Sequence, residues 1–292
     1  MIKHIYILIF CVFLYGLQLL NPTPTFAEEK PLLTSTEFAL KKLEKNQISK
    51  VMIQLLEKSF KSEKREKIIQ TNVLGFLERA DYSGHFSPSA IDRCHKFIKK
   101  NKKQLLRIEK MTGVSHKLIT ALLWVETKHG KVMGNYSVPN VFFTLIQADH
   151  PDLIRSTVIA LSEKAPNQLD EYKQKTIDRS YAKANWALGE IKSLDEILSK
   201  KAIQLKKLEG SSAGAFGISQ FIPSSYLQWA RPKSKTKHPD LFNVNDAIHS
   251  VGYYLKVNGW KAKDSAAQRE ALFHYNRSND YVDIILKIAS AL

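Results

Sequence analysis

The chain has 292 residues, of which 44% are hydrophobic and 25% charged, a composition that excludes disordered and collagen-like proteins. Its 44 lysine and arginine residues outnumber its 28 aspartate and glutamate residues, and the net charge is +16. So basic a chain indicates an anionic partner, whether nucleic acid, a membrane surface or an anionic polymer such as a bacterial wall, and two cysteines exclude a disulfide framework.

The N-terminus has the pattern of a secretory signal. Residues 5–27 contain no Asp, Glu, Lys or Arg, and their apolar stretch, residues 5–20, is somewhat short for a membrane span. The small-residue pattern that ends at Ala27 fits a cleavage site. We therefore predict an exported protein with a signal peptide over residues 1–27; an uncleaved anchor is the alternative.

The rest of the chain has helical periodicity almost throughout. Apolar residues at three-to-four spacing predict a helix over residues 38–60. Ser87 is an N-cap that opens a helix over residues 89–100, and Ser115 caps another that ends before Gly130. Five further helices are predicted over residues 152–164, 177–208, 246–258, 265–273 and 281–291.

The predicted fold class is therefore all-α, with a weak extended stretch near residues 138–143 as the only strand signal. The lysine-rich run over residues 96–110 lacks interleaved aromatics and has helical spacing. We interpret it as the solvated face of a helix and, because export also argues against it, expect no nucleic-acid partner.

Glu126 is the strongest catalytic candidate. It directly follows an apolar helical run, residues 118–125, and precedes Gly130 by four positions. Burial and the negative end of the helix dipole both raise the pKa of such a carboxyl, and a carboxyl protonated near neutral pH can act as a general acid. The alternative is a glutamate that reaches solvent or pairs with Lys128 or Lys131.

A second cluster, residues 210–226, has small residues at alternate positions that allow close backbone approach. Residues 210–214 also match the Gly-x-Ser-x-Gly nucleophile elbow, which would make Ser212 a hydrolase nucleophile. That motif needs a preceding strand, whereas residues 197–208 have helical spacing, so the elbow is disfavoured.

A third cluster, residues 275–281, combines tyrosines with amide and hydroxyl groups, as carbohydrate grooves do. The alternative is a corner between two helices with Asn279 or Asp280 as the N-cap. Metal sites and cofactors are not expected, because the histidines are scattered, Cys94 stands alone and no calcium loop occurs between residues 231 and 245.

Together these clusters resemble the family B lytic murein transglycosylases, lysozyme-like enzymes of the bacterial envelope. The matching motifs follow the family order over residues 82–281: Phe86 before Ser87-Pro88, Val125-Glu126-Thr127 before Gly130, residues 210–226, Asp246-Ala247-Ile248 before Gly259-Trp260, and Tyr275-Asn276 before Tyr281. Residues 28–80 match weakly.

The resemblance implies a lysozyme-like catalytic domain over residues 81–292, a helical N-terminal segment over residues 28–80, and a monomer that acts on peptidoglycan in the periplasm or cell envelope. Glu126 would protonate the bond between N-acetylmuramic acid and N-acetylglucosamine. It would then take a proton from the muramoyl 6-hydroxyl, which leaves a 1,6-anhydromuramoyl end. Asp246 and Asp280, the other acidic residues in the matched motifs, look like helix caps.

The resemblance also assigns the substrate-binding residues. Ser211 and Gln220 would bind the sugar and its N-acetyl group. Tyr275 and Asn276 would hold Glu126 and the reacting sugar. The groove would be lined by Tyr82, Tyr254 and Tyr281.

One departure from the family pattern is His129, where the family commonly has an aromatic such as Trp, so a subsite contact is open. The stretch between Tyr136 and Gly210 also matches poorly. Three other functions remain open: a hydrolysing muramidase with the same Glu126, a non-catalytic peptidoglycan-binding or assembly protein, and the Ser212 hydrolase. The positive charge suits a membrane or an anionic wall surface as a further contact.

Overall fold

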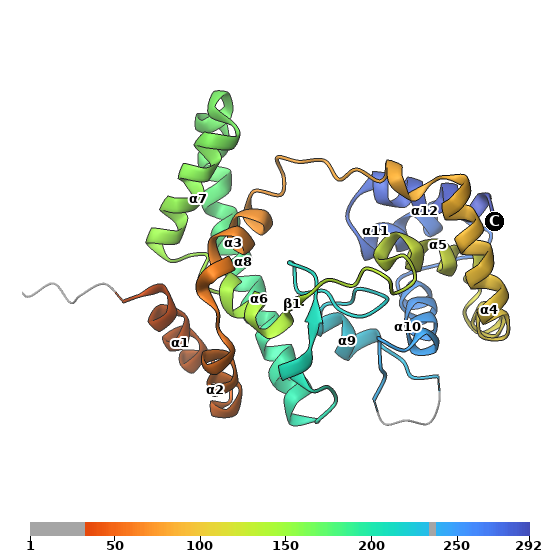
Figure 1. Ribbon diagram of the computed structural model, residues 1–292, viewed down its shortest axis with the longest axis horizontal. Helices are drawn as coiled ribbons and strands as arrows, with labels where there is room; N and C mark the ends of the chain where they lie inside the picture. The colour runs from red at the N-terminus through yellow and green to blue at the C-terminus, as the bar shows by residue number, and fades with distance from the viewer. Residues whose placement is uncertain (1–32, 234–237) are drawn as a thin grey trace, which may run out of the picture. The chain divides into compact units, whose positions relative to one another are not determined.

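Helices supply nearly all the regular structure of residues 33–233 and 238–292, the part of the chain that the computed structural model describes (Figure 1). The predicted all-α class is confirmed. In this part of the chain the one sheet is an antiparallel pair of two-residue strands, β1 (Tyr136–Ser137) and β2 (Glu209–Gly210). The predicted signal peptide lies outside the described residues.

One group of helices packs around the long helix α8. In this group α3 contacts α6, α7 and α8, and α2 contacts α6. Its helices are α1 (Ser35–Lys45), α2 (Lys50–Ser59), α3 (Arg65–Val73), α6 (Val138–Leu145), α7 (Pro151–Lys164) and α8 (Leu169–Ser199).

A second group packs around α5, which is buried between α4 and α12. The apolar run predicted to be buried in α5 is buried, with Leu118 to Trp124 all at most 3% exposed. The helices of this group are α4 (Pro88–Thr112), α5 (His116–Thr127), α10 (Val244–Val257), α11 (Ser265–Tyr275) and α12 (Asn279–Ser290). The short helix α9 (Pro223–Trp229) contacts both α8 and α10, so it links the two groups.

Both groups are built from separate stretches of the chain. Within the described residues the chain crosses between them at residues 74–87, 128–137 and 200–222. Each group therefore contains helices from two distant parts of the sequence.

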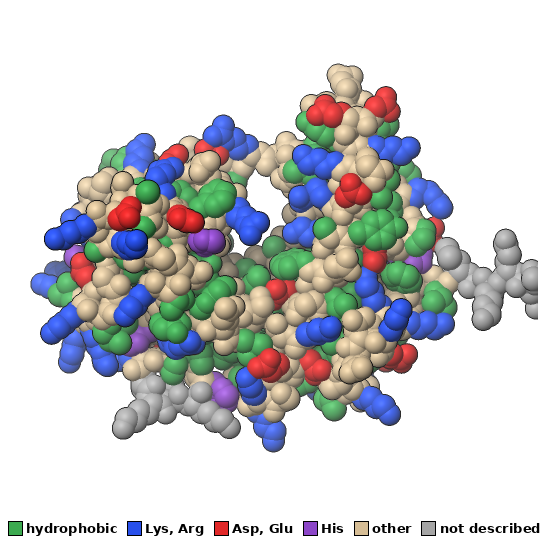
Figure 2. All heavy atoms as spheres, turned by 180° about the vertical axis from the view of Figure 1, so that it is seen from behind, with side chains coloured by type: hydrophobic (Ala, Val, Ile, Leu, Met, Phe, Trp, Pro, Cys, Tyr) green, Lys and Arg blue, Asp and Glu red, His purple; other side chains and the backbone are tan. Residues whose placement is uncertain are grey.

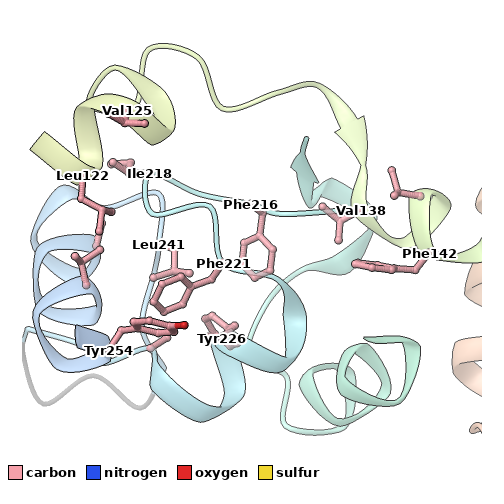
Figure 3. Close-up of a cluster of buried hydrophobic side chains, with 14 of the residues drawn as sticks. Leu122, Val125, Val138, Phe142, Phe216, Ile218, Phe221, Tyr226, Leu241 and Tyr254 are labelled. Carbon is pink, nitrogen blue, oxygen red and sulfur yellow. The ribbon is translucent and has the colours of Figure 1, made fainter. Parts of the chain in front are cut away.

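The third crossing contains the glycine-rich loop, residues 210–222, whose buried side chains join the hydrophobic core that runs through both helix groups (Figure 3). Phe216, Ile218 and Phe221 are buried there, among side chains that come from α5, α6, α9 and α10. Gly214 is required because its φ is +81° and a Cβ at this position would lie 2.3 Å from Cζ of Phe142. Gly214 thus allows the loop to pack closely against α6.

Two predicted helices have different bounds in the structure. The helix predicted over residues 38–60 is interrupted, because Gln47 has a φ of 60° and Ser49 starts α2 as its N-cap. The helix predicted over residues 177–208 begins earlier, at Leu169, and ends at Ser199.

Two further predictions also differ from the structure. The helix that Ser87 caps continues past residue 100 to Thr112, through a kink at Asn101 whose φ is −110°. Residues 138–143, expected to be extended, lie in α6, whose first turn contains Pro139, while the strand pairing occurs just before them. None of the helices in the described ranges has both the length and the apolar character that a bilayer crossing requires.

Candidate active site

Glu126 lies in the last turn of α5 and is half-buried. Its Oε1 accepts a hydrogen bond from the hydroxyl of Tyr281. Among the described residues Glu126 forms no ion pair, neither with Lys128 or Lys131 nor with any other cation. Burial raises the pKa of Glu126 to about 7, although the hydrogen bond from Tyr281 acts in the opposite direction. The carboxyl therefore holds its proton over much of the acid to neutral range.

Three tyrosines gather at this carboxyl from three different elements. Tyr281 of α12 is 2% exposed, and its ring stacks on that of Tyr275, at the end of α11, with centroids 6.4 Å apart and an interplanar angle of 14°. Tyr82, from the segment before α4, places its ring edge against Tyr281 at 6.0 Å. The structure thus brings together Tyr82, Tyr275 and Tyr281 of the predicted residues beside Glu126.

Tyr275 and Tyr254 use their hydroxyls to fix the backbone. The hydroxyl of Tyr275 donates to the carbonyl of Ser219 at 2.5 Å, and that of Tyr254 donates to the carbonyl of His274 at 2.9 Å. The two rings are 4.7 Å apart, and Tyr254 is only 6% exposed. Tyr254 therefore supports Tyr275 from within, and the Tyr275 hydroxyl joins α11 to the glycine-rich loop.

Ser211 and Gln220 lie at the two ends of the glycine-rich loop. The Oγ of Ser211 accepts the N–H groups of Ala213 at 3.3 Å and Ala215 at 3.2 Å, and its own proton is not used in those bonds. Gln220 has a φ of 49°, and its side-chain nitrogen donates to the carbonyl of Gly217 at 2.9 Å. A ligand at Gln220 would therefore meet its side-chain oxygen.

Asn276 is exposed at the C-terminus of α11. Burial and the charge of Glu126 raise the pKa of Tyr82, while hydrogen bonds with Ser278 and Asn276 lower it. Among the described hydrogen bonds, the one to the Glu126 carboxyl comes from Tyr281, and neither Tyr275 nor Asn276 contacts it in that way.

A cavity of about 450 Å³ adjoins Tyr275. Its polar and aromatic walls come from both helix groups, because α8 contributes to it together with α9, α10 and α11. It is lined by Trp186, Glu190, Gln220, Phe221, Ile222, Ser224, Ser225, Trp229, Tyr254, His274 and Tyr275.

Glu190 of α8 is a second buried carboxyl that the sequence did not reveal. It is 3% exposed and accepts both the N–H of Ser224, at 2.9 Å, and the Ser224 hydroxyl, at 2.8 Å. Burial raises its pKa, and these two bonds lower it. Its partner is 34 positions away on α9, so no local pattern marks it, and it fastens α8 to the helix that follows the glycine-rich loop.

Thr127, next to Glu126, belongs to a matched motif, but the sequence assigned it no role. Its hydroxyl donates to the carbonyl of Ile218 at 2.9 Å and accepts the N–H of Gly130 at 2.9 Å. Because Ile218 belongs to the glycine-rich loop, Thr127 ties the end of α5 directly to that loop.

His129 belongs to the packing between α4 and α5. Its ring stacks on Phe97 with centroids 3.9 Å apart, and its Nε2 lies 3.0 Å from the carbonyl of Thr120. Burial lowers the pKa of His129 to about 4, so the ring is neutral. His129, which departs from the family pattern, is therefore part of the packing between α4 and α5.

The interpretation of Asp246 and Asp280 as helix caps is wrong. Asn243 caps α10, and the carboxylate of Asp246 instead accepts the N–H groups of Lys233 and Asp240, both at 2.8 Å. Each oxygen of Asp246 thus accepts one backbone N–H from the segment before α10.

Ser278 caps α12, so neither Asn279 nor Asp280 has that role; Asp280 pairs with Arg79 on the first crossing. In the described part of the chain, no three His, Cys, Asp or Glu side chains are placed to share a metal ion. Cys94 is buried as a free thiol.

The expectation of a helix before Ser212 was wrong, but the elbow remains disfavoured. The strand β2 ends at Gly210, two residues before Ser212. No helix follows at once, since the next one, α9, begins at Pro223, and the Ser212 carbonyl accepts a bond from Asn72 at 3.0 Å. The strand–turn–helix arrangement that exposes a nucleophile is therefore incomplete.

Comparison with known proteins gives a consistent result. The model of the transglycosylase SLT domain family matches residues 35–279. Membrane-bound lytic murein transglycosylase B of Escherichia coli (strain K12) is 29% identical over 163 residues, which are 56% of this chain and 37% of that protein. The chain thus spans little more than a third of that relative's length.

Solved structures share the fold. The Escherichia coli lytic transglycosylase SLT35 in complex with bulgecin A gives a TM-score of 0.63 at 19% identity, covering 88% of this chain and 92% of its own. The soluble lytic transglycosylase SltB1 of Pseudomonas aeruginosa gives 0.64 at 18%, covering 88% and 97%. SltB3 of the same organism, in complex with NAG-NAM-pentapeptide, gives 0.64 at 15%, covering 87% and 77%.

Proposed function

Because the chain belongs to the transglycosylase SLT domain family, we propose that it is a lytic transglycosylase that cleaves peptidoglycan between N-acetylmuramic acid and N-acetylglucosamine. The observation that carries this proposal is the carboxyl of Glu126, raised to a pKa of about 7 and held by Tyr281 among stacked tyrosines. SltB3 of Pseudomonas aeruginosa, which shares the fold, binds NAG-NAM-pentapeptide in its solved complex, and this supports the same class of substrate.

Protonated Glu126 donates its proton to the glycosidic oxygen as the bond to the anomeric carbon breaks. The N-acetyl group of the same muramoyl residue stabilises the positive charge that develops. Glu126, now a carboxylate, takes the proton of the muramoyl 6-hydroxyl, and that oxygen bonds to the anomeric carbon. Glu126 thus gives up one proton and regains another. No water is consumed, and the product has a 1,6-anhydro ring.

This chemistry needs one carboxyl, whereas most glycosidases use two. In the structure the other carboxyls near the site are already committed: Asp280 to Arg79, and Glu190 to the two donors of Ser224. Those contacts support the single-carboxyl mechanism.

The residues around Glu126 position the substrate. Tyr82, which is half-buried, offers a ring surface next to Glu126, and the buried Tyr281 holds the carboxyl from below. Ser211 and Gln220 present a hydroxyl and an amide oxygen from the glycine-rich loop. Asn276 lies at the exposed margin with Tyr275 beneath it, and Tyr254 acts through Tyr275.

The wider assignment rests on the sequence. The enzyme is exported to the periplasm or cell envelope and acts as a monomer without a metal or other cofactor. Residues 81–292 carry the catalytic residues, and residues 28–80 are an N-terminal helical segment. Peptidoglycan strands are its substrate.

Mass spectrometry of the muropeptides released from purified peptidoglycan tests the proposal. All the contacts described above lie within residues 33–292, so a chain that begins at residue 28 retains them. We expect products that are lighter than hydrated ones by the mass of one water. Hydrated reducing ends would instead show a muramidase, and binding without release would show a non-catalytic protein.

A further inference from the structure

The second half of α4 carries a dense set of unpaired basic side chains. Beyond the kink at Asn101, Lys102, Lys103, Arg107 and Lys110 are exposed and form no ion pair within the described residues. We call these four residues the basic face of α4. The one acidic side chain in this half of the helix, Glu109, is already paired with His116 at 2.6 Å.

Apolar side chains are exposed among these cations. Leu106 is 43% and Met111 53% exposed, whereas Leu105 and Ile108 on the opposite side of the helix are buried. The end of α10 lies beside them, because Nζ of Lys256 donates to the carbonyl of Met111 at 3.0 Å, and the next residue, Val257, is 47% exposed. The patch therefore extends over two helices.

This patch is distant from the catalytic carboxyl. It adjoins the N-terminus of α5 through the Glu109–His116 pair, whereas Glu126 lies ten residues further along that helix, a rise of about 15 Å. Figure 2 shows Lys and Arg side chains along the left edge of the molecule, the side on which α4 lies, and hydrophobic atoms between them. A flat surface could contact this edge without covering Glu126.

We propose that the basic face of α4, with Leu106, Met111 and Val257, docks on an anionic phospholipid membrane. Cationic side chains gain free energy from the negative surface potential of such a membrane. Exposed apolar side chains between cations are typical of segments that rest in the headgroup region, where these side chains leave water. An anionic glycan or teichoic polymer would neutralise the lysines equally well but would leave Leu106 and Met111 in water, so the lipid surface fits both observations.

Docking in this way has a geometric consequence. The enzyme would hold the α5 N-terminus toward the lipid and the Glu126 end away from it. Glycan strands close to the membrane would then be the ones within its reach.

The test is sedimentation with vesicles, using a chain that starts at residue 28 so that residues 5–20 do not insert. Vesicles of phosphatidylglycerol and phosphatidylcholine are compared with vesicles of phosphatidylcholine alone. The test variant is K102Q/K103Q/R107Q/K110Q. The matched control, K41Q/K45Q/K50Q/K58Q, removes four exposed charges from α1 and α2, so both variants have the same net charge.

We expect the unmodified chain to bind the anionic vesicles only, and the test variant to bind them on the order of 10²- to 10³-fold more weakly. The control should lose far less. A second variant, Leu106→Gln with Met111→Gln, should weaken binding several-fold without changing net charge. Thermal unfolding and release of muropeptides should be unchanged in all of them, which separates this proposal from the catalytic one.

Equal losses in the test variant and the control would overturn the proposal, because they would show that net charge alone drives binding. Loss of binding to purified, lipid-free peptidoglycan in the test variant, with vesicle binding intact, would assign the face to the wall polymer and would also overturn it.

Discussion

Two glutamates withdrawn from solvent have different surroundings: Glu126, half-buried at the end of α5, and Glu190, buried in the middle of α8. Glu126 receives one hydrogen bond, from a tyrosine hydroxyl, and burial raises its pKa to about 7. Glu190 receives two from one serine, an N–H and a hydroxyl; burial raises its pKa too, while these bonds and one with Trp186 lower it. Burial alone therefore does not make a carboxyl a catalytic acid.

The number and kind of donors account for the difference. A backbone N–H is fixed in place and keeps donating whatever the charge of its partner, whereas a hydroxyl can rotate. Glu190 is thus suited to hold α8 and α9 together, and Glu126 is suited to lose and regain a proton at little cost. Substitutions of Glu126 should therefore change mainly the catalytic rate, and substitutions of Glu190 mainly the free energy of unfolding.

The largest expected effect is that of Glu126→Gln on activity. The amide keeps the size of the side chain but cannot donate a proton to the glycosidic oxygen, so the rate of muropeptide release should fall about 10²- to 10⁴-fold. Urea unfolding should show the protein folded as before. Full lytic activity in this variant would contradict the assignment of Glu126.

The second largest effect is a loss of stability, and it is expected at Glu190. In Glu190→Leu the N–H and hydroxyl of Ser224 lose their acceptor, so the free energy of unfolding should fall by about 1–3 kcal/mol. Glu190→Gln retains an acceptor oxygen and should lose less. Urea unfolding measures both, and an unchanged midpoint in Glu190→Leu would show that the contact holds nothing together.

The smallest effect is a displacement of the pH profile. The acid step requires protonated Glu126, so activity should decline as the pH rises through about 7. The Tyr281 hydroxyl favours the charged form, and Tyr281→Phe should therefore raise the pKa of Glu126 and move this decline to higher pH, by about one unit. A decline that stays in place, or moves to lower pH, would mean that Tyr281 does not control the proton of Glu126.

The contrast between the two glutamates also explains how much the sequence could reveal. Glu126 was identified because an apolar run leads directly up to it, a local pattern that is visible within one helix. The neighbours of Glu190 in the sequence are mixed, and its partner Ser224 comes from another helix. The prediction for Asp246 was wrong for the same reason, since its donors, the N–H groups of Lys233 and Asp240, lie outside α10.

Helix boundaries show the same limit. Caps such as Ser87 and Ser115 were predicted correctly because the capping signal is local. The break between α1 and α2 was missed because hydrophobic periodicity continues across it. There the N–H and hydroxyl of Ser49 bond to Asp195 of α8, at 2.8 Å and 2.5 Å, a contact between distant residues that periodicity does not record.

The three crossings between the helix groups also bear on how such a protein can be divided and inherited. Neither group is a continuous gene segment, so recombination at one point cannot exchange one group and leave the other whole. A protease that cut only within residues 74–87 would leave α3 packed against α6, α7 and α8. The nicked molecule would elute as one species in gel filtration until it was denatured. Substitutions in the N-terminal helices would have to remain compatible with the faces of α6 and α8 against which these helices pack.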